Sequence, residues 1–198
     1  MLRRLTAFLG CVVLSACMLT APERATTFAD GAILLQAPAG YCVDTVTSRS
    51  ASDFAVMAPC ATLGLEAPAP QIVGLVTAQA GAPESGAIVT DEIALRDFLI
   101  TDAGRALLST TGAASEITVL STQAFDDQVM VRFRDQGPPP LAGLQNEEWR
   151  GFVQVDGRLV TISVRGLAAA PLQDGPGAAL LKQVIAGLSP TSNADPAS

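Results

Sequence analysis

The sequence predicts an α+β fold, a mainly antiparallel sheet with helices packed on it. Apolar and polar side chains alternate over residues 129–134 and 158–164, as in strands with one buried face. The dipeptide Asp156-Gly157 is typical of a two-residue hairpin turn. Near the C-terminus, apolar residues recur at helical spacing instead. Strands joined by short turns and followed by a helix indicate this class.

The first half of the chain predicts shorter strands. Three of them are expected at 32–37, 41–43 and 54–58, separated by Pro, Gly and polar residues. The segment 71–77 is almost continuously apolar, which is typical of a strand covered on both faces.

Two helices are expected in the middle of the chain. Thr90 is the expected N-cap of the first, with acidic residues following it in the first turn. Thr101 is the expected cap of the second, and Gly112 its left-handed C-terminal residue. A strand is expected over 116–122.

The second half predicts a meander and a final helix. Strands are expected at 129–134, 149–155 and 158–164, with a proline loop at 137–140 between the first two. Asp174 and Pro176 indicate the start of the helix. Its apolar stripe would consist of Leu181, Val184, Ile185 and Leu188.

The N-terminus has the pattern of an export signal. Two arginines precede an apolar run that ends in Leu14-Ser15-Ala16-Cys17, which resembles the lipobox of bacterial lipoprotein signal peptides. The resemblance implies cleavage before Cys17 and lipidation of that cysteine. An ordinary cleaved signal peptide is the alternative. A membrane-spanning helix needs roughly 20 apolar residues and does not fit.

Processing at Cys17 would leave an acidic protein. Ten basic residues would face 19 acidic ones, a net charge of −9. This balance disfavours nucleic acid as a partner, because nucleic-acid affinity comes largely from neutralised phosphates. Membrane contact would come from the lipid anchor. The residue after Cys17 is Met18 and not the Asp that is associated with inner-membrane retention. The resemblance therefore implies the outer membrane, facing the periplasm.

Besides Cys17, which would carry the lipid, only Cys42 and Cys60 remain after the signal peptide. In an exported protein such a pair is most simply a disulfide. It would close a loop of about 19 residues and stabilise the fold by roughly 3 kcal/mol. A redox-active pair is the alternative, but the Cys-x-x-Cys spacing is absent.

The sequence predicts no catalytic, metal or cofactor site. It has no histidine, which excludes Ser-His-Asp and Cys-His systems and the usual zinc sites. Two carboxylate couplets remain, Asp126-Asp127 and Glu147-Glu148. Adjacent residues of a strand point to opposite faces, so neither couplet is by itself an acid/base pair. An envelope hydrolase using carboxylates from separate segments is the alternative to a non-enzymatic protein.

A set of polar and aromatic residues in the meander is a candidate binding patch. Arg and Trp are typical of recognition surfaces, and clustered guanidinium groups suit carboxylates, phosphates or acidic partners. The alternative is that the arginines face water and the tryptophan lies in the core. The set consists of Arg132, Arg134, Trp149, Arg150, Arg158 and Arg165.

The order of elements resembles the PsbP-like α/β/α sandwich, as does Pro38-Ala-Gly-Tyr41, which is similar to the family's Pro-x-Gly-Trp. The cysteine pair and Gly104-Arg-Ala-Leu-Leu108 also resemble small envelope lipoproteins of alphaproteobacteria. The lack of catalytic residues and the PsbP-like resemblance together favour a non-enzymatic module that binds an envelope protein or a small ligand. The expected layout is a signal peptide (1–16), a lipidated tether (17–31), one globular domain (32–188) and a disordered tail (189–198).

Overall fold

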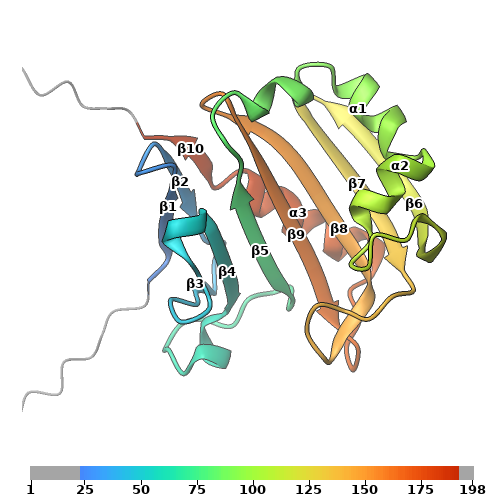
Figure 1. The fold of residues 1–198 in the computed structure, drawn as a ribbon. Coiled ribbons are helices and arrows are strands. Elements are labelled where there is room, and N and C mark those ends of the chain that lie inside the picture. Colours follow the sequence, from blue (N-terminus) through green and yellow to red (C-terminus); the bar gives the residue numbers. More distant parts are fainter. Residues whose placement is uncertain (1–22, 192–198) are drawn as a thin grey trace, which may run out of the picture.

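Within residues 23–191, which the computed structural model describes, two antiparallel sheets and three α-helices form the fold (Figure 1). The small sheet has the order β1-β2-β10 and the large sheet β3-β4-β5-β9-β8-β7-β6. The strands are β1 (Ala25–Phe28), β2 (Ile33–Gln36), β3 (Tyr41–Val43), β4 (Phe54–Pro59), β5 (Leu75–Ala80), β6 (Ile117–Phe125), β7 (Gln128–Asp135), β8 (Leu144–Val155), β9 (Arg158–Leu167) and β10 (Leu188–Pro190). The α-helices are α1 (Glu92–Leu99), α2 (Asp102–Leu108) and α3 (Asp174–Ile185), and the 3₁₀ segments are η1 (Ser50–Ser52), η2 (Cys60–Leu63), η3 (Ser85–Val89) and η4 (Ala114–Glu116).

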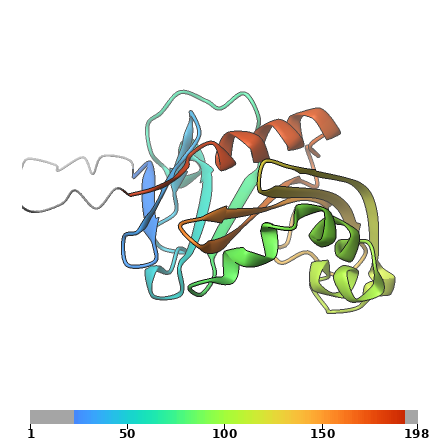
Figure 2. The same cartoon turned by 90° about the horizontal axis from the view of Figure 1, so that it is seen from above.

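The large sheet is covered on both faces (Figure 2). On one face, α3 and the small sheet enclose the larger core. On the other, α1 and α2 pack over β6 and β7 around a second core that includes Val129, Val131 and Phe133. Figure 1 shows β4, β5 and β9 without an α-helix in front of them on this second face. The predicted α+β class with helices on an antiparallel sheet is confirmed.

The hairpin at Asp156-Gly157 is confirmed. Both residues have positive φ, +49° and +72°, as a type I′ turn requires. A second turn of this kind joins β6 to β7 at Asp126-Asp127, with φ of +50° and +56°. The sequence did not predict it, because neither position is the Gly or Asn that usually signals such a turn.

Helix capping follows the prediction at one position and differs at two. Thr101 caps α2, accepting from the Gly104 N–H at 3.2 Å. Asp91, and not Thr90, caps α1, because the Thr90 hydroxyl donates to the Ala87 carbonyl instead. Gly112 has φ +81° but lies in a turn beyond Ser109, the C-cap of α2.

The domain extends beyond the expected limits at both ends. Residues 25–28, expected within the tether, form β1, and Phe28 is only 2% exposed. Leu188, expected at the end of the last helix, begins β10, which pairs with β2 and reaches Pro190 in the expected tail. Strands this short lack a readable alternation and depend on β2 for their hydrogen bonds. Residues 1–22, with the signal peptide and Cys17, and residues 192–198 lie outside the described part.

The disulfide between Cys42 and Cys60 is confirmed. Their Cα atoms lie 4.9 Å apart and both residues are buried. The bond ties β3, an edge strand of the large sheet, to η2. Within residues 23–191, no helix is long and apolar enough to cross a membrane.

Candidate ligand-binding cleft

The structure divides the six residues of the expected patch between the two faces of the large sheet. Arg132, Arg134 and Trp149 lie on the face covered by α3. Arg150 and Arg165 lie on the opposite face, since strand neighbours alternate. The six residues therefore do not form one patch.

On the α3 face, the arginines are paired. Glu147 accepts from Arg132 at 2.9 Å and from Arg134 at 2.5 Å. Partial burial acts to raise the pKa of Glu147, but the hydrogen bonds and charges of the two arginines outweigh it and lower the pKa. Arg132 also pairs with Asp174 at the start of α3. Trp149 is 3% exposed, with the Arg132 guanidinium 5.4 Å from its ring centre. This cluster fastens α3 to the sheet.

Arg158 has a separate role at the rim of the sheet. Its Nη1 donates to the Gly81 carbonyl at 2.8 Å and so holds the segment that follows β5 against β9.

On the opposite face, Glu148 lies between two arginines. Its Oε1 accepts from Arg150 Nε at 2.6 Å, and its Oε2 accepts from Arg165 Nε at 2.7 Å. Glu148 is 2% exposed and Arg165 is 4% exposed. Arg165 Nη1 also donates to the Gln145 carbonyl at 3.2 Å, and its Nη2 lies 2.6 Å from Glu148 Oε2.

Arg150 also belongs to a row of three polar side chains that runs across the sheet. Thr77 of β5 is opposite Ser163 of β9, and Ser163 is opposite Arg150 of β8. Neighbouring strands lie about 4.8 Å apart, so the three side chains are close together on one face. Each of the three is half-buried.

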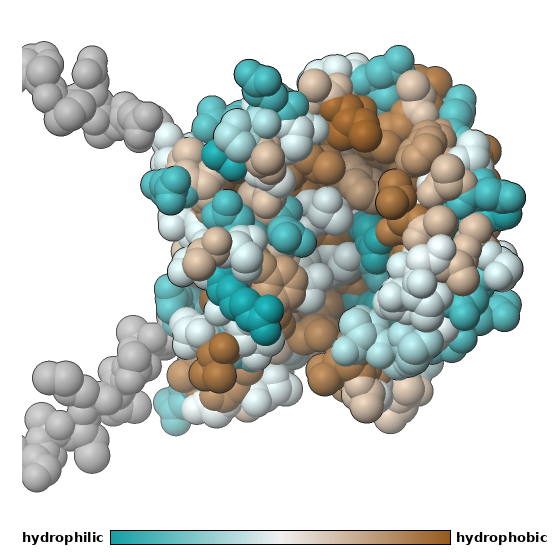
Figure 3. All heavy atoms as spheres, viewed as in Figure 1, coloured by the Kyte–Doolittle hydropathy of each residue, from teal (hydrophilic) through white to brown (hydrophobic). Residues whose placement is uncertain are grey.

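The row lies at the floor of a cleft of about 260 Å³. Figure 3 shows a hollow over β5 and β9, between β4 and α2 of Figure 1, with apolar residues around it. Asp135 braces one wall, because its Oδ2 accepts from the N–H and the hydroxyl of Thr110. The lining consists of Phe54, Leu75, Thr77, Thr110, Pro140, Leu144, Glu148, Arg150, Ser163 and Arg165.

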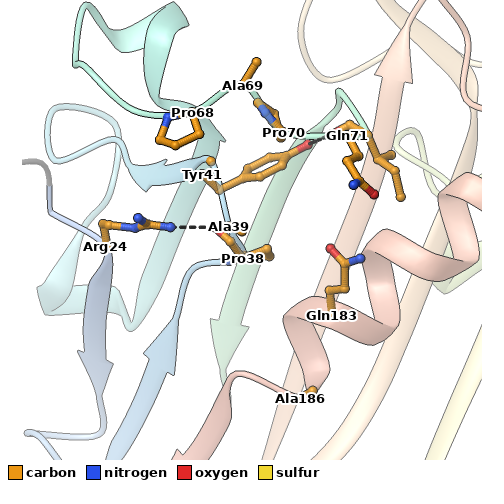
Figure 4. Close-up of a pocket in the computed structure, with 12 residues that line it drawn as sticks. Arg24, Pro38, Ala39, Tyr41, Pro68, Ala69, Pro70, Gln71, Gln183 and Ala186 are labelled. Carbon is orange, nitrogen blue, oxygen red and sulfur yellow. Dashed lines mark hydrogen bonds between the residues drawn. The ribbon is translucent and has the colours of Figure 1, made fainter.

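A larger groove of about 640 Å³ lies on another part of the surface (Figure 4). It is lined mainly by the segments 38–41 and 68–72, with Gln183 of α3 opposite Gln71. The hydroxyl of Tyr41 is already used, since it accepts from the Gly74 N–H and donates to the Ile72 carbonyl, both at 2.9 Å. Most of this groove is apolar surface, and its one charged lining residue within the described chain, Arg24, donates to the Pro38 carbonyl at 3.4 Å.

The carboxylate couplets do not converge on a cleft. Glu147 and Glu148 point to opposite faces, as expected, and Asp126-Asp127 lies in a turn. Another hollow is lined by Glu23 and Asp44. A hydrogen bond from the Thr47 hydroxyl lowers the pKa of Asp44, with smaller contributions from the N–H groups of Thr47 and Val46. An ionised, hydrogen-bonded carboxylate of this kind braces its loop.

The sequence did not single out Thr77 and Ser163 as members of one site. Their alternation with apolar neighbours placed Ser163 on a polar face, which was a usable signal. Nothing in the sequence showed that β5 pairs with β9, because that pairing joins segments far apart in the chain.

No protein-family model matches the chain, and no curated protein sequence matches it. Similar solved structures include a point mutant of the protein Mog1, with a TM-score of 0.51 and 10% identity over 86% of this chain and 97% of that one. The Ran-binding protein Mog1p of Saccharomyces cerevisiae has a TM-score of 0.48 and 12% identity, covering 85% of this chain and 95% of that one. PsbP of the cyanobacterium Synechocystis, from the family that the sequence resembles, has a TM-score of 0.41 and 10% identity, covering 92% of this chain and 98% of that one. The likeness to the Mog1 mutant shows a common fold.

Proposed function

We propose that this chain is a lipid-anchored, non-enzymatic binding protein of the bacterial cell envelope, which holds an envelope partner or a small ligand in the cleft over β5 and β9. One observation carries the proposal. A row of polar side chains, Thr77, Ser163 and Arg150, lies at the floor of an open, largely apolar cleft. Concave apolar sites with a few convergent polar groups are typical of ligand binding.

The chemistry of the floor favours binding over catalysis. Both oxygens of Glu148 already accept from guanidinium groups, which leaves this carboxylate poorly placed to move a proton. The chain also has no histidine. The remaining groups are hydroxyls and a guanidinium, which recognise ligands through hydrogen bonds and charge.

The proposed location rests on the lipobox and is supported by the disulfide. The residues Leu14-Ser15-Ala16-Cys17 follow the lipoprotein pattern. A buried disulfide between Cys42 and Cys60 suits an oxidising compartment such as the periplasm.

The test compares three proteins in cells: the wild type, Ser163→Trp, which fills the cleft, and Thr118→Trp. Thr118 is an exposed strand residue opposite Arg134 and serves as the matched control. After crosslinking, each protein is isolated for identification of its neighbours, and native mass spectrometry identifies retained small molecules. We expect Ser163→Trp to lose at least one species that the other two retain. Identical sets from all three folded proteins would contradict the proposal.

The location is tested in the same cells. Cys17→Ala removes the acylation site, so we expect this variant to leave the membrane fraction while the wild type stays in it. A Cys17→Ala protein that fractionates like the wild type would contradict lipid anchoring at this residue.

A further inference from the structure

The guanidinium of Arg150 is only partly used by the protein. Its Nε donates to Glu148 at 2.6 Å, and its Nη1 makes a long bond of 3.4 Å to the Leu107 carbonyl. Its Nη2 makes no hydrogen bond to any part of residues 23–191, and the side chain is 17% exposed. Arg150 lines the cleft, and its guanidinium also lies over the Phe133 ring, 5.0 Å from the ring centre. Nη2 is therefore the N–H group of this cleft residue that has no hydrogen-bond partner within the described chain.

The floor of the cleft has more positive than negative charge. Two guanidinium groups, of Arg150 and Arg165, share the single carboxylate of Glu148. A further carboxylate, Asp135, lies behind Thr110, but its oxygens accept from Thr110 and from the Gly137 N–H. The charged group of the cleft lining with unused hydrogen-bonding capacity is thus a cation.

Ser163 adds a second donor next to this cation. Its Oγ accepts from Arg150 Nε at 3.2 Å, so its own proton is free to point into the cleft. The neighbouring Thr77 hydroxyl makes no side-chain hydrogen bond within the described chain and lies in the same row. A planar guanidinium beside a hydroxyl suits the two oxygens of a carboxylate.

The rest of the cleft is apolar and small. Its apolar lining residues are Phe54, Leu75, Pro140 and Leu144. The volume of about 260 Å³ is below the roughly 300 Å³ at which sites for drug-sized ligands begin. The fitting ligand therefore has a short apolar body.

We propose that the cleft binds a small organic monocarboxylate, with its carboxylate on Arg150 Nη2 and the Ser163 hydroxyl and its apolar body against Leu75 and Leu144. This inference rests on the proposed function, because it names the ligand class of the same cleft.

Isothermal titration calorimetry of the full chain in a neutral detergent tests it with three probes: benzoate, hexanoate and benzamide. Benzamide has nearly the shape of benzoate without its charge. We expect at least one of the two carboxylates to bind the wild type, with a dissociation constant at least tenfold lower than that of benzamide. Arg150→Gln and Ser163→Ala should each weaken carboxylate binding, the first at least tenfold, because a charge-assisted hydrogen bond is lost.

Arg134→Gln is the control, since it removes an arginine from the opposite face and should bind like the wild type. Circular dichroism checks that each variant is folded. If Arg150→Gln does not fold, Ser163→Ala still tests the inference. Equal binding of benzoate and benzamide, or carboxylate binding unchanged in Ser163→Ala, would overturn the inference. If no probe binds but Ser163→Trp still loses a species in cells, the ligand class is wrong and the proposed function stands.

Discussion

At the scale of single residues, Tyr41 shows how one side chain decides where a strand begins. It is 1% exposed, and its hydroxyl is bonded to the backbone of Ile72 and Gly74. These bonds hold residues 71–74 outside the ladder, so β5 starts at Leu75 and not at Gln71 as the apolar run predicted. Burial raises the pKa of Tyr41 to about 12, against a smaller opposing contribution from the bond with Gly74.

Tyr41 is the only tyrosine of the chain, so its ionisation can be followed by phenolate absorbance. We expect titration near pH 12 in the folded protein and near pH 10 in denaturant. Because the folded pKa is the higher one, the associated stability is fully present below about pH 10 and is lost as pH rises toward 12. Tyr41→Phe should remove this pH dependence and cost about 1–3 kcal/mol, because it leaves the Gly74 N–H buried and unpaired. A folded protein that titrates near pH 10 would contradict this account.

At the scale of elements, the packing of α3 depends on one close approach. A Cβ on Gly177 would lie 2.3 Å from Cε2 of Trp149, whereas a Cβ on Gly175, in the same helix, would meet nothing within 4 Å. The absence of a side chain at Gly177 therefore lets α3 lie flat on the indole ring.

These two glycines form a matched pair of sites for substitution. Gly177→Ala should lower the free energy of unfolding by about 1–3 kcal/mol, because the ring must move. Gly175→Ala should leave it unchanged or raise it by up to about 1 kcal/mol, since Ala favours helix. Urea unfolding measures both, and fluorescence of the only tryptophan reports the displaced ring. Equal stabilities for the two variants would show that this contact is not tight in solution.

At the scale of the whole molecule, the large sheet has two differently covered faces. The α3 face is closed by a helix and a small sheet, while α1 and α2 cover β6 and β7 on the other. The cleft lies over β5 and β9, beside these helices. The floor of the cleft is therefore a sheet whose opposite face is packed against α3 and the small sheet. The Cys42–Cys60 bond braces the β3 edge of the same sheet.

The disulfide should contribute to the stability of the whole domain. We expect the double variant Cys42→Ala, Cys60→Ala to be less stable by roughly 3 kcal/mol, because its unfolded chain is less constrained. Dithiothreitol should lower the melting temperature of the wild type. It should leave the double variant unchanged, and a wild type insensitive to reduction would argue against a stabilising bond.

Much of the fold was predictable because the signals are local. Alternation indicated β7 and β9, and Asp156-Gly157 indicated the hairpin between β8 and β9. The candidate site was less predictable from the sequence. Alternation also implied that Trp149 and Arg150 point to opposite faces, which already conflicts with placing both in one patch. Alternation could not predict which residues of the neighbouring strands lie beside Arg150, because Ser163 and Thr77 are far from it in the sequence.

The sequence by itself determined the α+β class, the main hairpin, the cysteine pair and the lack of histidine chemistry, because periodicity, turn residues and composition act over short distances. Tertiary structure alone decided that β5 pairs with β9, that Thr77, Ser163 and Arg150 share one row, and that this row lies at the floor of a cleft. The physical reason is that strand pairing and register between distant segments depend on how both faces of the whole sheet are buried.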